Sequence, residues 1–338
     1  MVRSALPYLV AIGLGSSIHP ALAAGRAVEI VGVAGSATAD ALLVGAGGEL
    51  YKRSGTAWRR TSEGGTAATL VRARGGSPTD IWAIGANTPS YHYDGKTWAV
   101  VKLGISGPGL LSRAGTPAVA VGRRVYVQVL GKWQILPALP AASGPAAPAP
   151  APIIDVWANG PKDAIALSEN GELRRLVGST WQPIRHGLPQ GEAPRRLLAG
   201  PAGQVFAVGD GGTLIRVERL AARKFGRAPQ VPAGTRWLFS SVAQNKLWLV
   251  GEEGDKLVLG RVDGLQVTLV DTAAAPAEGD DLAAMLVAAD GSVLVATKKG
   301  IVYARGPAGP FTQERVDATA PTPAPHPQNP PAVQGSGP

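Results

Sequence analysis

Few residues in this sequence are of types that perform chemistry. The chain has no Cys and only four His, which excludes disulfides, thiolate metal sites and Cys nucleophiles. His19 and His326 fall in the two terminal segments, so His92 and His186 are left for a folded body, where we interpret both as surface or packing residues. No Gly-x-Ser-x-Gly or His-Glu-x-x-His motif occurs. We therefore assign no catalytic residue, no metal and no cofactor.

Acidic residues occur in two patterns that could bind or react. Three aspartates each precede a short apolar run, where an Asx turn would join two strands: Asp40, Asp80 and Asp163. A second, compact group lies between two apolar runs and is typical of a solvated turn or of oxygen ligands for Ca²⁺: Glu252, Glu253 and Asp255. We prefer the turn interpretation for both groups.

The composition limits the elements that can position such residues. Among 338 residues there are 45 Gly and 29 Pro, and both residue types interrupt helices. This excludes coiled coils and helical bundles. Hydrophobic residues make up 45% of the chain, which is enough for a sizeable core. The length fits two average domains or one large all-β domain.

One pattern of short strands recurs along the chain. Its clearest copy, residues 153–184, alternates apolar runs with Gly-Pro-Lys-Asp and Asn-Gly turns, as strands and tight turns do. The residue that ends the second strand marks each copy, at intervals of 37 to 46 residues: Gly45, Gly85, Gly122, Ser168, Gly209, Gly251 and Thr297. This interval is typical of one four-stranded propeller blade. We predict an all-β, seven-bladed β-propeller of four-stranded antiparallel blades; six or eight blades are the alternatives.

Large apolar residues repeat at fixed places within the copies. A Trp follows the marker residue by 13 positions in three copies (Trp58, Trp98, Trp181) and by 11 in a fourth (Trp133). Three positions before the marker every copy has a large or branched apolar residue: Leu42, Trp82, Val119, Ile165, Phe206, Trp248 and Leu294. We expect these side chains to pack between neighbouring blades.

The segments DIWAIG (80–85) and YDGKTW (93–98) resemble the repeats of exported bacterial β-propellers, which read Asp-x-Trp-Ala-x-Gly and Asp-Gly-x-x-Trp. These repeats are of the Asp-box/kelch-like kind, and YDGKTW is also similar to part of the Asp-box turn of sialidase-type propellers. It is one residue short of that pattern, and no other copy repeats its Asp. The resemblance covers about residues 26–316. It implies the propeller fold and leaves the function open, because propellers include enzymes, receptors and scaffolds.

The resulting domain organisation has four parts. Residues 1–24 are typical of a signal peptide, with one basic residue, a short apolar run and small residues before the cleavage site. The propeller covers 25–316, a Pro/Ala linker (141–152) separates the third and fourth blades, and a Pro-rich tail (317–338) is expected to be disordered. The approximate blades are 26–64, 67–104, 109–140, 153–188, 194–232, 235–273 and 281–316. We expect ring closure by packing between the first and last blades; a shifted frame is the alternative.

Basic residues outnumber acidic ones, 33 to 24, and their placement along the copies is uneven. We assign a basic arc to the face that carries the turns between second and third strands. Six of its members are expected on those turns and three in the segments that enter inner strands: Lys52, Arg53, Arg123, Arg124, Lys298 and Lys299, then Arg72, Arg74 and Arg113. Glu49 is the one acidic residue expected on this arc. A basic arc favours an anionic partner.

The sequence therefore predicts an exported, non-catalytic binding or scaffolding propeller of the periplasm, cell surface or extracellular space. The expected partner is a protein in an envelope complex, or an acidic polysaccharide. Nucleic acid is not expected, because the export signal removes the chain from it, and no transmembrane segment is expected after cleavage. The alternative is a glycan-active hydrolase or lyase of acidic polysaccharide. Converging Arg, Tyr and carboxylate side chains near the central channel would distinguish that enzyme from a scaffold.

Overall fold

The computed structural model describes residues 28–66, 68–86, 90–101, 110–111, 117–140 and 151–317. The predicted signal peptide, most of the Pro/Ala linker, nearly all of the Pro-rich tail and Arg113 lie outside the described residues. The described chain is all-β apart from one short 3₁₀ turn, η1 (Pro201–Gly203). No helix in this part of the chain is long and apolar enough to cross a membrane.

Consecutive strands form antiparallel meanders of four strands each. The first meander consists of β1 (Ile30–Ala34), β2 (Leu42–Gly45), β3 (Glu49–Ser54) and β4 (Ala57–Gly64). The second consists of β5 (Leu70–Ser77), β6 (Asp80–Gly85), β7 (Tyr91–Tyr93) and β8 (Trp98–Val100). The third consists of β9 (Leu110–Leu111), β10 (Ala118–Val121), β11 (Arg124–Val129) and β12 (Lys132–Ile135). Next come β13 (Ile153–Ala158), β14 (Ala164–Ser168), β15 (Leu173–Val177) and β16 (Thr180–Pro183), then β17 (Pro194–Ala199), β18 (Val205–Gly209), β19 (Leu214–Glu218) and β20 (Ala221–Lys224).

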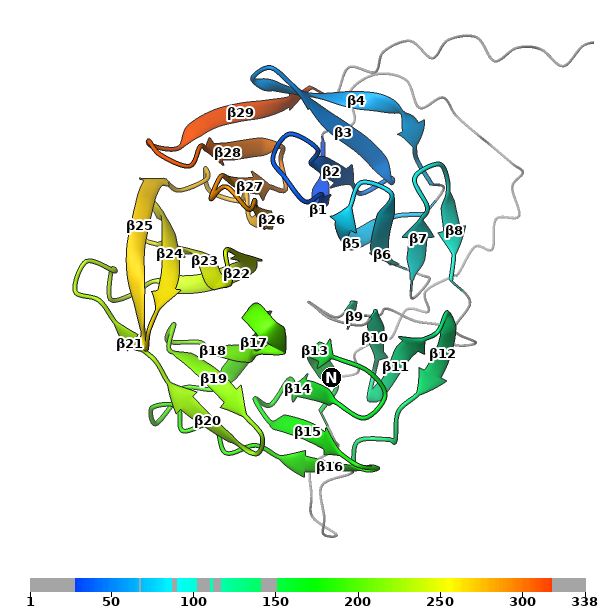
Figure 1. Ribbon diagram of the computed structural model, residues 1–338, viewed down its shortest axis with the longest axis vertical. Helices are drawn as coiled ribbons and strands as arrows, with labels where there is room; N and C mark the ends of the chain where they lie inside the picture. Colours follow the sequence, from blue (N-terminus) through cyan, green and yellow to red (C-terminus); the bar gives the residue numbers. More distant parts are fainter. Residues whose placement is uncertain are drawn as a thin grey trace, which may run out of the picture.

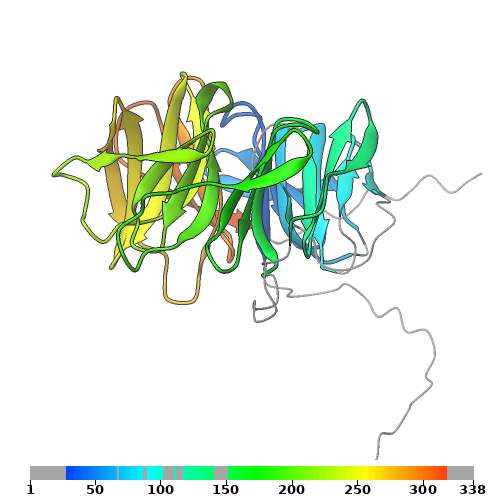
Figure 2. The ribbon, with the colours of Figure 1, turned by 90° about the horizontal axis from the view of Figure 1, so that it is seen from below.

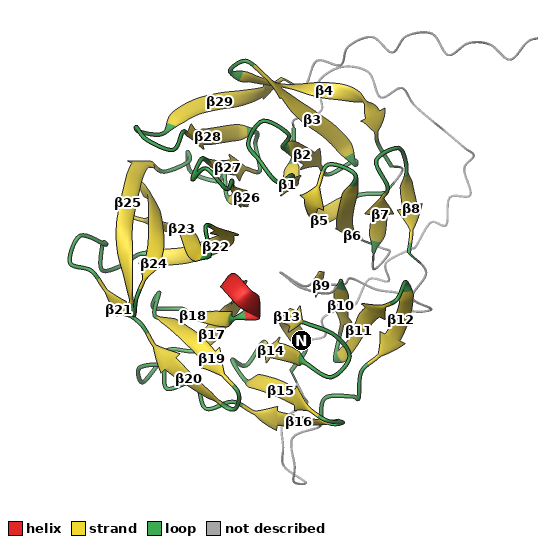
Figure 3. Ribbon diagram, viewed as in Figure 1, coloured by secondary structure: helices red, strands yellow, loops and turns green. Residues whose placement is uncertain are grey.

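The last two meanders contain the longest strands. They consist of β22 (Arg236–Ala243), β23 (Lys246–Glu253), β24 (Lys256–Asp263) and β25 (Gln266–Ala274); β26 (Leu282–Val287), β27 (Val293–Thr297), β28 (Ile301–Arg305) and β29 (Thr312–Asp317). A short strand, β21 (Gly226–Arg227), pairs in parallel with β25 and adds a fifth strand to that sheet. Figure 3 shows the described chain as strands and loops, with η1 as the one short helix drawn in it.

The meanders are arranged around a central axis, with the first strand of each nearest the axis and the fourth at the outer margin (Figure 1). Seen from the side, they form a thick disc (Figure 2). Strands alternate in direction, so turns between second and third strands emerge at one face of the disc, which we name the 2–3 face. Turns between first and second strands, and between third and fourth strands, emerge at the opposite face, which we name the 3–4 face.

The hydrophobic core is divided among the spaces between neighbouring meanders. Each apolar cluster combines residues of two adjacent meanders, as Val125 of β11 and Val156 of β13 illustrate. The second strands β14, β18 and β27 are buried at every position, because adjacent meanders cover both of their faces. Burial of this apolar surface is the main force that holds the meanders together.

The four recurring tryptophans each contact the meander before their own. The indole N–H groups of Trp98 and Trp181 donate to the carbonyl oxygens of Gly48 (3.0 Å) and Pro137 (2.7 Å). Trp133 packs edge-on against Trp82 of the preceding meander, with ring centroids 5.9 Å apart. The repeated apolar residues before each marker position also lie in these inter-meander clusters: Leu42, Trp82, Val119, Ile165, Phe206, Trp248 and Leu294.

The first and last meanders contact each other directly. β29 pairs in parallel with β4, and the backbone N–H of Ile30 donates to the carbonyl oxygen of Lys298 at 2.8 Å. The fourth strand of the last meander comes from its own part of the chain, as the unshifted frame of the sequence predicts. The indole N–H of Trp58 crosses this junction and donates to Glu314 at 2.9 Å.

Candidate functional site: a cavity at the centre of the ring

A cavity of about 470 Å³ lies where the inner strands of several meanders face the central axis. Its wall comes from β1, β5, β22 and β26 and from the end of β17. The polar side chains in this wall are two arginines and three serines: Arg72, Arg74, Ser36, Ser240 and Ser241. No carboxylate, Tyr or His is among the described residues that line it. Such a wall can recognise an anionic group through guanidinium and hydroxyl donors.

Both arginines belong to β5, and a β-bulge determines how they are presented. The pairing of β5 with β6 shifts between Leu70 and Arg72, which leaves Val71 as the extra residue. Bulges re-aim the side chains that follow them. Arg72 is half-buried and Arg74 is exposed. Equivalent bulges occur in the inner strands β1, β13, β17, β22 and β26. The bulge is therefore a common feature of the inner strands and is not specific to β5.

The opposite wall of the cavity is more apolar and is fixed by contacts between meanders. Ser241 accepts a hydrogen bond from the backbone N–H of Val287 at 3.1 Å. The guanidinium of Arg196 lies 5.4 Å from the ring centroid of Phe239 and also donates to the carbonyl oxygen of Leu238. This wall therefore offers a rigid apolar surface opposite the two arginines of β5.

The described residues of the predicted basic arc lie in three separate places. Arg72 and Arg74 line the cavity, and Lys52 and Arg53 lie toward the 3–4 face. The other four lie at turns of the 2–3 face: Arg123, Arg124, Lys298 and Lys299. Among these, Arg123 donates to the carbonyl oxygens of Leu139 and Pro140, and Lys298 forms an ion pair with Asp281 at 2.8 Å. These two residues have structural partners on the protein itself.

The assignment of Lys52 and Arg53 to the 2–3 face is wrong. Lys52 pairs with Leu42, the first residue of β2, and Arg53 pairs with Trp58 beside the turn to β4. Strand β3 carries its residues about 3.3 Å further from the turn at each step, so both lie toward the 3–4 face. Arg53 is also engaged in an ion pair with Glu314, a side chain only 2% exposed.

The other candidate residues make local contacts. Asp40 accepts hydrogen bonds from the backbone N–H groups of Ser36 and Ala37, which precede it by four and three residues. It therefore holds the turn from its C-terminal end and does not form the expected Asx turn, in which the side chain accepts from an N–H two residues further on. Asp80 contacts Nε2 of His92 at 2.8 Å, and the His92 ring stacks on Trp82. No group of three His, Asp or Glu that could hold a metal ion occurs in the described ranges.

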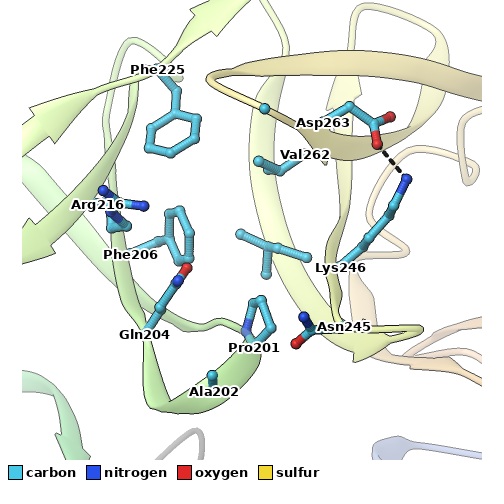
Figure 4. A pocket seen from close by; sticks show the side chains of 12 residues that line it. Pro201, Ala202, Gln204, Phe206, Arg216, Phe225, Asn245, Lys246, Val262 and Asp263 are labelled. Carbon is cyan, nitrogen blue, oxygen red and sulfur yellow. Dashed lines mark hydrogen bonds and ion pairs between the residues drawn. The ribbon is translucent and has the colours of Figure 1, made fainter.

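A second hollow, of about 410 Å³, lies between the β17–β20 and β22–β25 meanders and is lined by both (Figure 4). Phe206 and Phe225 form one wall, with ring centroids 5.5 Å apart, and Arg216 lies 6.0 Å from the Phe225 centroid. Val262 and an ion pair between Lys246 and Asp263 (2.6 Å) form the other side. No pattern in the sequence indicates this hollow, because its walls come from different repeats and share no motif.

Asp263 has a strongly perturbed carboxyl group at this hollow. Partial burial raises its pKa, but hydrogen bonds from Lys246, Arg261 and Thr268 outweigh that effect and lower the pKa from 3.8 to about 2. The three donor–acceptor distances are 2.6, 3.0 and 2.9 Å. The group is therefore ionised at any ordinary pH and holds the turn between β24 and β25.

We expect the stabilisation from Asp263 to depend on pH in a defined direction. Its folded pKa lies below the unfolded value, so the contribution is full above pH 3.8 and is lost as the pH falls toward 2. Because the site is well solvated, Asp263→Asn should cost less than about 1 kcal/mol at neutral pH. Urea unfolding of both proteins from pH 7 to pH 2 measures this. A difference that stays constant over the whole range would contradict the assignment.

Comparison with known proteins places the fold among the β-propellers. No family model and no curated protein matches the sequence. YCF48 from Cyanidioschyzon merolae superposes with a TM-score of 0.59 at 16% identity, covering 85% of this chain and 98% of that one. YCF48 bound to D1 peptide gives 0.54 at 15%, covering 86% and 94%. Inactive virginiamycin B lyase from Staphylococcus aureus with quinupristin gives 0.57 at 11%, covering 80% and 92%. At these identities the likeness shows the propeller fold alone.

Proposed function

We propose that the chain is an exported, seven-bladed β-propeller that acts as a non-catalytic binding or scaffolding module for an anionic partner. The observation that carries this proposal is the central cavity, in which Arg72 and Arg74 face a wall of serines and apolar residues. The polypeptide frame around the cavity is rigid, because each inner strand is held by its own sheet. A rigid backbone frame around a binding cavity lowers the conformational entropy that is lost when a ligand binds.

The cavity favours binding over glycan chemistry. A hydrolase or lyase of acidic polysaccharide needs a general acid or base close to the bound sugar. The described lining has guanidinium and hydroxyl groups but no carboxylate, Tyr or His. The similar β-propeller YCF48 has been solved bound to D1 peptide. We therefore propose an acidic protein segment of an envelope complex as the partner, with acidic polysaccharide as the alternative ligand.

Two matched charge-reversal variants test where the partner binds. Arg72→Glu with Arg74→Glu should lower the recovery of the cross-linked partner at least tenfold, because two attractive contacts become repulsive. Arg124→Glu with Lys298→Glu makes the same charge change at the 2–3 face and should leave most of the recovery intact. The measurement is cross-linking of the tagged protein in the cells that produce it, at low and at raised salt, followed by identification of what co-purifies.

The outcomes separate the parts of the proposal. A stoichiometric protein lost at raised salt and lost with the cavity variant supports it. Loss with the 2–3 face variant alone would move the site to that face. Recovery of polysaccharide without protein would overturn the protein partner, and turnover of that polysaccharide would overturn the non-catalytic assignment.

A further inference from the structure

Four consecutive meanders present an exposed aliphatic side chain at the turn between their third and fourth strands. The residues and their exposed fractions are Leu130 (98%), Val177 (43%), Leu220 (37%) and Leu265 (46%). The corresponding turns of the three other meanders, residues 55–56, 94–97 and 306–311, have no exposed aliphatic side chain larger than Ala or Pro, and Phe311 in the last of them is partly buried against the core. The aliphatic turns therefore occupy one continuous part of the ring, from β11–β12 to β24–β25 (Figure 1).

These four turns all belong to the 3–4 face, because they connect strands of the same order in successive meanders. Each lies at the outer margin, between the third strand and the fourth. They are separated by the width of a meander, so they do not merge into one apolar patch. We name them the aliphatic turns.

Leu130 is placed at a backbone conformation that disfavours it. Its φ is 49°, followed by Gly131 at 77°, and two-residue hairpin turns with two positive φ angles prefer Asn-Gly or Asp-Gly. A bulky residue at positive φ is strained, and a side chain that is 98% exposed gains no packing in return. A strained backbone conformation that no packing contact compensates is typical of functional positions.

The charged side chains around the aliphatic turns are mostly basic when residues that form ion pairs with each other are left out. Lys132, Lys162 and Arg219 are exposed on this side and form no ion pair within the described part of the chain. Three acidic residues of the same region are each paired with a basic side chain: Asp163 with Arg175, Glu218 with Arg216, and Asp263 with Lys246. The unpaired charge that the surface presents is therefore positive.

We propose that the aliphatic turns dock this side of the propeller onto an anionic lipid surface. The four side chains would enter the headgroup region while Lys132, Lys162 and Arg219 contact lipid phosphates. A protein interface needs a continuous, closely packed apolar centre, which separated turns do not provide. A bilayer needs only that the turns reach a common plane. The proposal is independent of the central cavity, because neither Arg72 nor Arg74 belongs to this surface.

The test is co-flotation of the purified protein with vesicles of phosphatidylcholine, with and without phosphatidylglycerol. We expect binding to the anionic vesicles that falls at raised salt. Leu130→Asn should reduce the bound fraction at least threefold, because it removes the most exposed apolar side chain. Its melting temperature should stay equal or rise, because Asn tolerates a positive φ. Binding is thereby separated from folding.

A control variant has the same chemical change at exposed aliphatic residues outside the four turns: Val71→Ser, Val100→Ser and Ile135→Ser. It should bind vesicles like the unchanged protein, whereas Leu130→Ser, Val177→Ser, Leu220→Ser and Leu265→Ser together should abolish binding. Equal binding of these two variants, or no binding of the unchanged protein to anionic vesicles, would overturn the proposal. Undiminished binding of Leu130→Asn would overturn the role given to the strained turn.

Discussion

Replacing Gly32 by alanine is expected to lower the free energy of unfolding by about 3 kcal/mol, because it forces two inner strands apart. β1 and β5 pair in parallel, with Gly32 opposite Ala73 and Val33 opposite Arg74. A Cβ atom at position 32 would lie 2.1 Å from the carbonyl oxygen of Ala73, which is backbone and cannot move away alone. The equivalent residues of β13 and β17, Asp155 and Arg196, have side chains, and these strands do not pair with the next inner strand.

Gly76→Ala is the matched control for this variant. Gly76 lies in β5 itself, and a Cβ atom there would meet nothing within 4 Å, so its effect should stay within about 0.5 kcal/mol. Urea unfolding followed by tryptophan fluorescence compares the two. Because Arg74 lies opposite Val33 in the same pairing, Gly32→Ala should also weaken partner binding in the cavity. Equal stability of both variants would show that the close approach of β1 to β5 is not required for the stability of the protein.

The sequence reveals the propeller because its strongest signals are local. Runs of strand residues, turn residues and a Trp at a constant distance all lie within one repeat. The structure adds the reason for the constant distance: Trp98 and Trp181 each reach a backbone carbonyl of the preceding meander. The number of blades stays a prediction from the repeat count.

The candidate site is harder to derive, because its parts come from different repeats. From the sequence, Arg72 and Arg74 are expected in a segment that enters an inner strand, whereas both lie within the inner strand β5 itself. The cavity they line also needs Ser241 and Met285 from the last two meanders. The error with Arg53 has a related cause. Counting from a turn locates a residue along the strand only if the end of that strand is known, and Arg53 lies at the far end, beside Glu314.

Glu314 shows what local patterns cannot reveal. Its segment is typical of an exposed outer strand, yet the side chain is 2% exposed, because Trp58 and Arg53 cover it across the junction of the first and last meanders. These partners are 256 and 261 positions away in the chain. Nothing in the local sequence distinguishes this carboxylate from a solvated one.

Removing the positive partner of Glu314 should therefore destabilise the protein strongly. Among the described residues, Arg53→Met leaves only the Trp58 indole N–H as a side-chain donor to the buried Glu314 carboxylate, which costs about 3 kcal/mol or more. Glu314→Gln in the Arg53→Met background removes that charge and should restore a large part of the loss. Such a recovery, measured by urea unfolding as a double-mutant cycle, would identify the buried charge as the cause.

The exposed pair Lys298–Asp281 supplies the comparison for this experiment. Its side chains are 51% and 72% exposed, so Lys298→Met should cost less than about 1 kcal/mol. Arg53 differs because it neutralises a carboxylate at the junction where β29 and β4 meet. Loss of this contact should therefore also raise the hydrogen-exchange rate of β29 and β4 above that of β14, which lies far from the junction. An Arg53→Met protein no less stable than Lys298→Met, with unchanged exchange in β29, would show that β29 and β4 stay paired without this ion pair.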